Sequence, residues 1–373
     1  MWHSILVWSK KIDWFLFLNI ALLSLFSLTA LYSLNIGQSF NLNNLFVRQL
    51  IFVIVGFILA ILLSFIDYRW LKNYYKVWLG IVLFLLLLVL FFAEPIRGMT
   101  GWLEIGGQTF QPSELAKLAV IIFLAHYFTE RDTVLSQWQQ IVVSGGVVFL
   151  FAVLVAMQPD FGSAAVIFGT WLVLLFFTKL PRRYFAYLLA LLVAGAAILW
   201  FFVLLPYQQA RLVSFLQPEQ DALGSGYNVQ QSMIAIGSGQ VLGRGLGLGP
   251  QSQLNFLPEQ YSDFIFAVIA ESLGLWGTWL LLGLFLILFI RLTLLVRDSG
   301  STFAAWLVLG FVIYLCLQVI INIAMNIGWA PVTGITLPFV SYGGSSMLTS
   351  FITLGIIQSI IIKRREKLFT PAA

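Results

Sequence analysis

Long apolar runs separated by short polar segments make up most of this chain. A helix needs about 20 predominantly apolar residues to cross the hydrocarbon core of a bilayer, and the runs come close to that length. The pattern therefore predicts an all-α, polytopic integral membrane protein with ten transmembrane helices. The predicted spans are 14–34, 49–66, 77–93, 113–128, 141–157, 161–178, 184–205, 263–290, 303–325 and 335–362.

Basic residues gather on alternate connections between these spans. If both termini are cytoplasmic, fifteen of the 20 Lys and Arg residues fall in cytoplasmic segments. Such an excess is the usual signature of the cytoplasmic side of a membrane protein. We therefore predict that both termini are cytoplasmic, and we attribute the basic pI of about 9.3 to orientation rather than to nucleic-acid binding.

The composition agrees with a membrane protein, because 60% of the 373 residues are hydrophobic and only 9% are charged. The single cysteine, Cys316, excludes an intrachain disulfide. Without an internal repeat or a low-complexity linker, we expect one membrane domain over 1–373. Its one long connection, the predicted extracytoplasmic loop at about 206–262, is rich in glycine but has no G-x-G-x-x-G register. Within it, 229–236 could form a short amphipathic helix along the membrane surface.

Asp263 stands where the apolar run of the eighth span begins. An acid at such a position is costly unless it faces water, a partner charge or a substrate, so it is a candidate functional residue. The structural alternative is that Asp263 caps the helix that follows it. The two interpretations are about equal for Asp263 considered alone, and the neighbouring charges favour function.

Four further charges are predicted at the outer end of the spans. Glu114 and Lys117 lie three residues apart in the first turn after Pro112 and can pair on one helix face, either for function or only to fix helix packing. Asp160 lies in a short turn between two spans, where turn or cap chemistry explains it equally well. Glu271 follows Asp263 by eight residues, about 12 Å deeper along a straight helix.

The inner half of the predicted bundle looks almost purely apolar, whereas ion pathways string charges through the whole thickness. No H-x-x-H, C-x-x-C or G-x-S-x-G pattern occurs, and His3 and His126 are predicted on the cytoplasmic side. An outer site with one acid and nearby cations suits chemistry on a lipid-linked substrate with a polar headgroup.

Several segments resemble motifs of the shape, elongation, division and sporulation (SEDS) family, in the expected order over nearly the whole chain. They are QPSELAK at 111–117, QPDFG at 158–162, LPE at 257–259 with DFIFA at 263–267, and PFVSYGGS at 338–345. The segment AIGSG at 235–239 resembles the branch that acts in elongation more than the branch that acts in division.

The resemblance implies a peptidoglycan glycosyltransferase in the bacterial cytoplasmic (inner) membrane. Family members polymerise lipid II, an undecaprenyl-pyrophosphate-linked disaccharide-pentapeptide, and work with a class B penicillin-binding protein. Asp263 matches the family's essential acid, and Glu114, Lys117 and Asp160 match its other functional charges. Two positions depart from the family pattern, because Gly101 replaces a common Arg and Tyr261-Ser262 replace a His-Thr pair.

In the mechanism we expect, Asp263 is the catalytic base and cations stabilise the leaving pyrophosphate. Lys117 is the first candidate cation, and a divalent ion (Mg or Mn) could assist. The remaining candidates for substrate binding or charge stabilisation are Arg48, Arg211, Glu271 and Ser341. The alternatives are a lipid II flippase, a division-specific polymerase, and a scaffold that only recruits wall enzymes.

Overall fold

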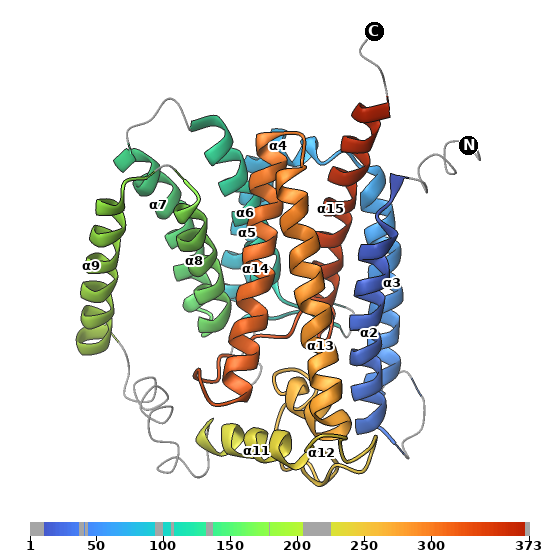
Figure 1. The fold of residues 1–373 in the computed structure, drawn as a ribbon. Helices are drawn as coiled ribbons and strands as arrows, with labels where there is room; N and C mark the ends of the chain where they lie inside the picture. Colours follow the sequence, from blue (N-terminus) through green and yellow to red (C-terminus); the bar gives the residue numbers. More distant parts are fainter. Residues whose placement is uncertain are drawn as a thin grey trace.

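A computed structural model describes residues 11–36, 41, 44–93, 100–105, 108–131, 137–178, 180–203 and 225–369. Its helices run mostly side by side, and α2 begins at the same end of the bundle at which α15 ends (Figure 1). We call this end of the bundle the terminal end and the opposite end the distal end. Helix α11 lies across the distal end, with α12 close to it (Figure 1).

The helices, in chain order, are α2 (Trp14–Leu34), α3 (Leu45–Phe65), α4 (Arg69–Asn73), α5 (Tyr75–Phe92), α6 (Pro112–Arg131), α7 (Gln137–Ala156), α8 (Phe161–Phe176), α9 (Arg182–Ile198) with the π-helical turn η1 (Leu199–Val203), α11 (Ser225–Ser238), α12 (Pro250–Gln253), α13 (Ile265–Arg297), α14 (Thr302–Asn326) and α15 (Gly344–Phe369). A short antiparallel hairpin, β1 (Leu103–Ile105) and β2 (Gln108–Phe110), precedes α6.

Eight helices of the described ranges are long and apolar enough to cross a membrane. The two other predicted spans correspond to α8, which is shorter, and α6, whose charges lower its hydropathy. A predominantly helical membrane protein with several spans is therefore confirmed. The count of ten spans and the cytoplasmic termini stay predictions. The predicted start of the last span at 335 is wrong, because 335–343 is not helical and α15 begins at Gly344. Phe339 has a φ of 62°, which a helix cannot contain.

Two apolar cores hold the bundle together. The larger joins α2, α3, α13, α14 and α15, and the smaller lies mainly among α5, α6, α7, α8 and α9. The most extensive helix contact is between α3 and α15. Small residues allow it, because a Cβ on Gly355 would lie 2.9 Å from the carbonyl oxygen of Ala60.

Helix α13 is broken at Gly274, where φ is 66° and ψ is −160°. The glycine-rich segment after α11 bonds to the backbone on both sides of this break. Leu275 donates its N–H to the carbonyl of Gln240, and Arg244 donates its N–H to the carbonyl of Glu271 (2.9 Å each). The break therefore leaves these backbone groups satisfied, as a low-dielectric surrounding requires. The segment 229–236 is helical, as predicted, and forms part of α11. Its place along the membrane surface stays a prediction.

Candidate functional site

Asp263 is half-buried and lies just before α13, which begins at Ile265. The N-cap of α13 is Phe264, whose side chain makes no capping hydrogen bond. The capping alternative for Asp263 is therefore wrong. Its Oδ2 lies 3.7 Å from where a Cβ on Gly334 would stand, so the carboxylate faces the segment 333–341 that precedes α15.

Ser341 supports the backbone next to this acid. Its Oγ donates to the carbonyl of Ser262 and accepts the N–H of Leu337, which lies 2.8 Å away. Gln49 of α3 donates to the Ser341 carbonyl (3.1 Å). Ser341 thus joins three segments at the site, and its hydroxyl contacts protein backbone.

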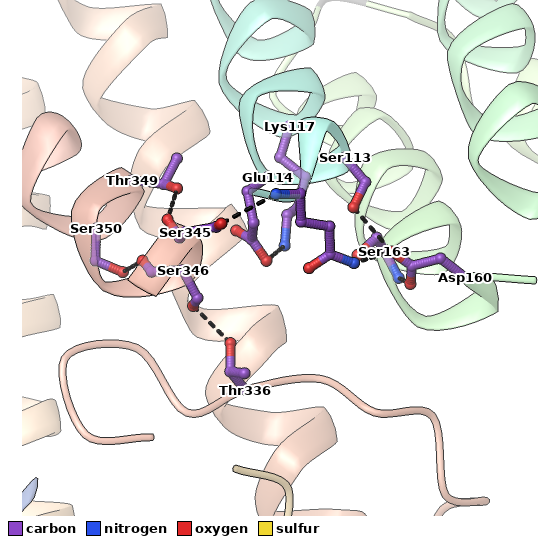
Figure 2. A network of polar contacts seen from close by, with 11 residues as sticks. Ser113, Glu114, Lys117, Asp160, Ser163, Thr336, Ser345, Ser346, Thr349 and Ser350 are labelled. Carbon is purple, nitrogen blue, oxygen red and sulfur yellow. Dashed lines mark hydrogen bonds and ion pairs between the residues drawn. The ribbon is translucent and has the colours of Figure 1, made fainter. Parts of the chain in front are cut away.

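Asp160 caps the N-terminus of α8. Its Oδ1 accepts the N–H of Ser163 (3.0 Å), and its Oδ2 accepts from Gln111 Nε2 (2.9 Å) and Ser113 Oγ (2.8 Å). The carboxylate is buried. The cap interpretation is therefore confirmed, and Asp160 also binds the start of α6 to the start of α8 (Figure 2).

Glu114 and Lys117 form a buried ion pair in the first two turns of α6. Lys117 Nζ lies 2.7 Å from Glu114 Oε1, and both side chains are no more than 5% exposed. Lys117 Nζ also lies 5.7 Å from the ring centroid of Tyr314 on α14. Among the described residues, Glu114 Oε2 has no hydrogen-bond partner. Pairing on one helix face is thus confirmed.

The segment 333–346 connects these groups. A Cβ on Gly162, two residues after Asp160, would lie 2.5 Å from the carbonyl oxygen of Thr333, whose neighbour Gly334 faces Asp263. Thr336 Oγ1 lies 2.6 Å from Ser346 Oγ, and Ser345 Oγ accepts the N–H of Gln111 (3.0 Å) at the start of α6. Figure 2 shows Glu114 and Lys117 between the α15 hydroxyls on one side and Asp160 on the other.

Glu271 is fully buried and has a structural partner. Its two carboxylate oxygens accept the N–H groups of Gln251 (2.9 Å) and Ser252 (3.1 Å) at the start of α12. Arg48 lies half-exposed in the first turn of α3, directly before Gln49, which reaches Ser341. Arg211 lies outside the described residues, as does Arg97, the cation nearest to Gly101 in the sequence.

Sequence reasoning missed the polar side chains that support these charges. Gln111, Ser113 and Ser345 bind the acidic groups or the backbone around them. Asn322 and Asn326 could have been singled out from the sequence. They are two amides one turn apart in an apolar span, and buried amides in a membrane need hydrogen-bond partners. At the terminal end, Asp13 is a buried charge paired with Arg291 (2.6 Å), although an almost purely apolar inner half was predicted.

Within the described ranges, no group of three or more His, Cys, Asp and Glu residues is arranged to hold a metal ion. The carboxylates of Asp160 and Glu271 are engaged by N–H and O–H donors, so they do not form a ligand set. A divalent ion therefore stays a prediction.

The architecture is that of a polytopic, predominantly helical membrane protein. Among the described residues, its buried charges are Asp13 near the terminal end and Glu114, Lys117, Asp160 and Glu271 toward the distal end. A family model described as "Cell cycle protein", covering FtsW, RodA and SpoVE, matches residues 10–366. The chain therefore belongs to this family, the SEDS family.

Individual relatives agree. Peptidoglycan glycosyltransferase MrdB of Escherichia coli K12 is 37% identical over 313 residues, covering 84% of either chain. A probable peptidoglycan glycosyltransferase FtsW of Coxiella burnetii is 39% identical over 321 residues, covering 84% of this chain and 86% of that protein.

Solved structures agree as well. The crystal structure of Thermus thermophilus RodA matches with a TM-score of 0.71 at 28% identity, covering 95% of this chain and 97% of that one. A solved structure of a peptidoglycan synthase complex, described in terms of how it coordinates polymerization and crosslinking, matches with a TM-score of 0.78 at 30% identity. The match covers 95% of this chain and 98% of that one.

Proposed function

We infer that this chain is a peptidoglycan glycosyltransferase that polymerises lipid II at the outer face of the bacterial cytoplasmic membrane. Relatives at 37% and 39% identity carry the name of that enzyme class. The observation that carries the site assignment is Asp263, a half-buried acid at a helix start that it does not cap. The distal end, toward which Asp263 and the Glu114–Lys117 pair lie, is the outer face in this proposal.

The reaction needs a base at the acceptor sugar and positive charge at the leaving group. The acceptor's 4-hydroxyl oxygen attacks the donor's anomeric carbon, and Asp263 takes the hydroxyl proton as the new bond forms. The bond from the anomeric carbon to the pyrophosphate oxygen breaks, and undecaprenyl pyrophosphate leaves with the electron pair. One such displacement inverts the anomeric centre.

Lys117 is the first cation proposed to stabilise the departing pyrophosphate, with Arg48 and Arg211 behind it. Lys117 is buried and its charge is already balanced by Glu114, so a phosphate group would compete with that carboxylate for the ammonium. Glu114 therefore holds the lysine in place and limits its positive field when no substrate is bound. A Mg or Mn ion, if the reaction requires one, would add positive charge at the pyrophosphate.

The proposed topology has ten spans, with α6 and α8 added to the eight apolar helices, and cytoplasmic termini. Helix α2 begins and helix α15 finishes at the same end of the bundle, and this supports an even number of membrane crossings (Figure 1). We propose a class B penicillin-binding protein as partner and elongation as the cellular role. The matches to RodA and to a peptidoglycan synthase complex support both proposals.

The test is polymerisation of lipid II by purified protein together with its partner. Asp263→Asn keeps the size of the side chain but cannot accept the proton, so we expect a folded protein with activity lowered about 100- to 10,000-fold. Asp263→Glu moves the carboxylate by about 1 Å and should retain about one hundredth of the activity at most. An Asn variant with the wild-type rate would refute the base assignment.

A flippase is the rival function. Among the described residues, the buried charges are Asp13 near the terminal end and Glu114, Lys117, Asp160 and Glu271 toward the distal end. Between them, the hydroxyls of Thr349, Ser350 and Thr353 bond carbonyls of their own helix, so these three groups need no water as a partner. Lipid II in detergent separates the two functions, because a polymerase makes glycan chains there and a flippase makes none.

A further inference from the structure

Asn322 and Asn326, one turn apart on α14, are completely buried. A buried amide is costly unless its donors and acceptor find partners. Both side chains direct a donor to the same atom: the Nδ2 of Asn322 and the Nδ2 of Asn326 each lie 3.0 Å from the carbonyl oxygen of Asp263. The backbone of the proposed base is therefore held by two amides from another helix.

The amide group of Asn322 also bonds the segment that the Asp263 carboxylate faces. Its Nδ2 also donates to the carbonyl of Ile335 (2.7 Å), next to Gly334, which faces the Asp263 carboxylate. One amide group thus spans the two backbone segments on either side of that carboxylate. A change in this amide would alter the spacing between the base and the segment it faces.

Asn326 supplies the acceptor that α13 needs at its start. Its Oδ1 accepts the N–H of Ala267 (3.2 Å) in the first turn, where α13 has no side-chain N-cap of its own. The Ser232 hydroxyl of α11 donates to the Asn326 carbonyl (2.8 Å). Asn326 therefore joins α11 and α14 to the segment that carries Asp263, and accepts an N–H that an N-cap would otherwise accept.

We propose that Asn322 and Asn326 are positioning residues that set the distance and direction of the Asp263 carboxylate for proton transfer. The inference rests on the proposed function, in which Asp263 is the base. The asparagines act through the Asp263 backbone, so their loss lowers kcat more than it changes KM. A displacement of about 1 Å costs on the order of 100-fold, and a partial one costs about 10-fold.

The test compares Asn322→Ala and Asn326→Ala with a matched control, Gln358→Ala. Gln358 is also a buried amide that bonds the backbone of another helix start, since it accepts the Asp13 N–H and donates to the Asp13 carbonyl (3.1 Å each). It lies near the terminal end. All three variants lose buried hydrogen bonds and packing, so thermal stability should fall in each.

We expect kcat for lipid II polymerisation to fall about 10- to 100-fold in the two asparagine variants, with KM changed less than about threefold. Gln358→Ala should keep kcat within about threefold. Hydrogen exchange at 264–270 should accelerate in Asn326→Ala and remain unchanged in Gln358→Ala, because only the former removes the acceptor for the Ala267 N–H. Wild-type kcat in both asparagine variants, or an equal loss of kcat in the control, would overturn the inference.

Three further outcomes bear on the inference. If an alanine variant does not fold, Asn322→Ser or Asn326→Ser replaces it, and failure of the serine variants to fold would assign the pair to stability alone. If Asp263→Asn polymerises at the wild-type rate, the base assignment falls, and the positioning role falls with it, even if hydrogen exchange shows that Asn326 protects the start of α13. If Asp263→Asn is inactive while both asparagine variants keep kcat, only the positioning role falls.

Discussion

The buried pair of Glu114 and Lys117 offers the sharpest separation of a structural role from a role in catalysis. The perturbations are Lys117→Met, Glu114→Gln and the two together. They remove charge, and the new side chains are unbranched like the old ones or of the same shape. Each single variant leaves one uncompensated charge among groups that are at most 5% exposed. The double variant leaves none.

The expected magnitude follows from the geometry. At a separation of 2.7 Å, the attraction is about 6 kcal/mol with an effective dielectric constant of about 20. Desolvation of the two ions offsets much of it, so breaking one member of such a pair costs about 3–5 kcal/mol, whereas replacing both is close to neutral. Lys117→Met also removes a cation–π contact with Tyr314, which adds about 1 kcal/mol.

Thermal unfolding in detergent and lipid II polymerisation are measured on the same four proteins. If Lys117 also binds pyrophosphate, the double variant regains thermal stability and stays inactive, because methionine cannot stabilise the leaving charge. Recovery of both properties in the double variant would refute the role of Lys117 in catalysis. Additive losses of stability in the double variant would refute the buried-pair energetics.

Two further predictions concern the broken helix α13. Gly274→Ala should lower the free energy of unfolding by at least about 2 kcal/mol, because φ is 66° and the new Cβ would lie 2.2 Å from the Gly243 nitrogen. The control Gly283→Ala, on the same helix with open space around its Cβ, should stabilise by about 0.5–1 kcal/mol, and equal thermal shifts would contradict the argument. Glu271→Gln should cost about 1–3 kcal/mol by removing one acceptor for the N–H groups of α12. A fall in kcat beyond about 10-fold per folded molecule would show that Glu271 also acts in the site.

The membrane spans were predictable because their signal is local. The predicted 14–34 coincides with α2, and most other boundaries differ by a few residues. The last span failed at its start, where 335–343 is apolar enough to be read as helix but contains Pro338 and the left-handed Phe339. Hydropathy cannot distinguish a buried irregular segment from a helix, since both exclude charge.

The break in α13 was unpredictable for a different reason. Gly274 lies in an apolar run that also contains Gly277 and Gly283, and nothing local marks it as the break. What determines the break is a distant partner, the segment 240–245, whose backbone groups bond those on either side of Gly274. Pairing of that kind depends on the folded arrangement and has no signature in a single window of sequence.

In the candidate site, too, the sequence indicated which residue types matter but not which partners they have. An acid at the start of an apolar span identified Asp263, yet the sequence left function and capping equally open. The choice depended on where the helix begins, because a residue caps only if the next one is helical and its oxygen reaches the first-turn N–H groups. The structure begins α13 two residues later and supplies the acceptor for Ala267 from Asn326 on another helix. Because Asn326 of α14 accepts this first-turn N–H, the carboxylate of Asp263 is not needed as a cap at the start of α13.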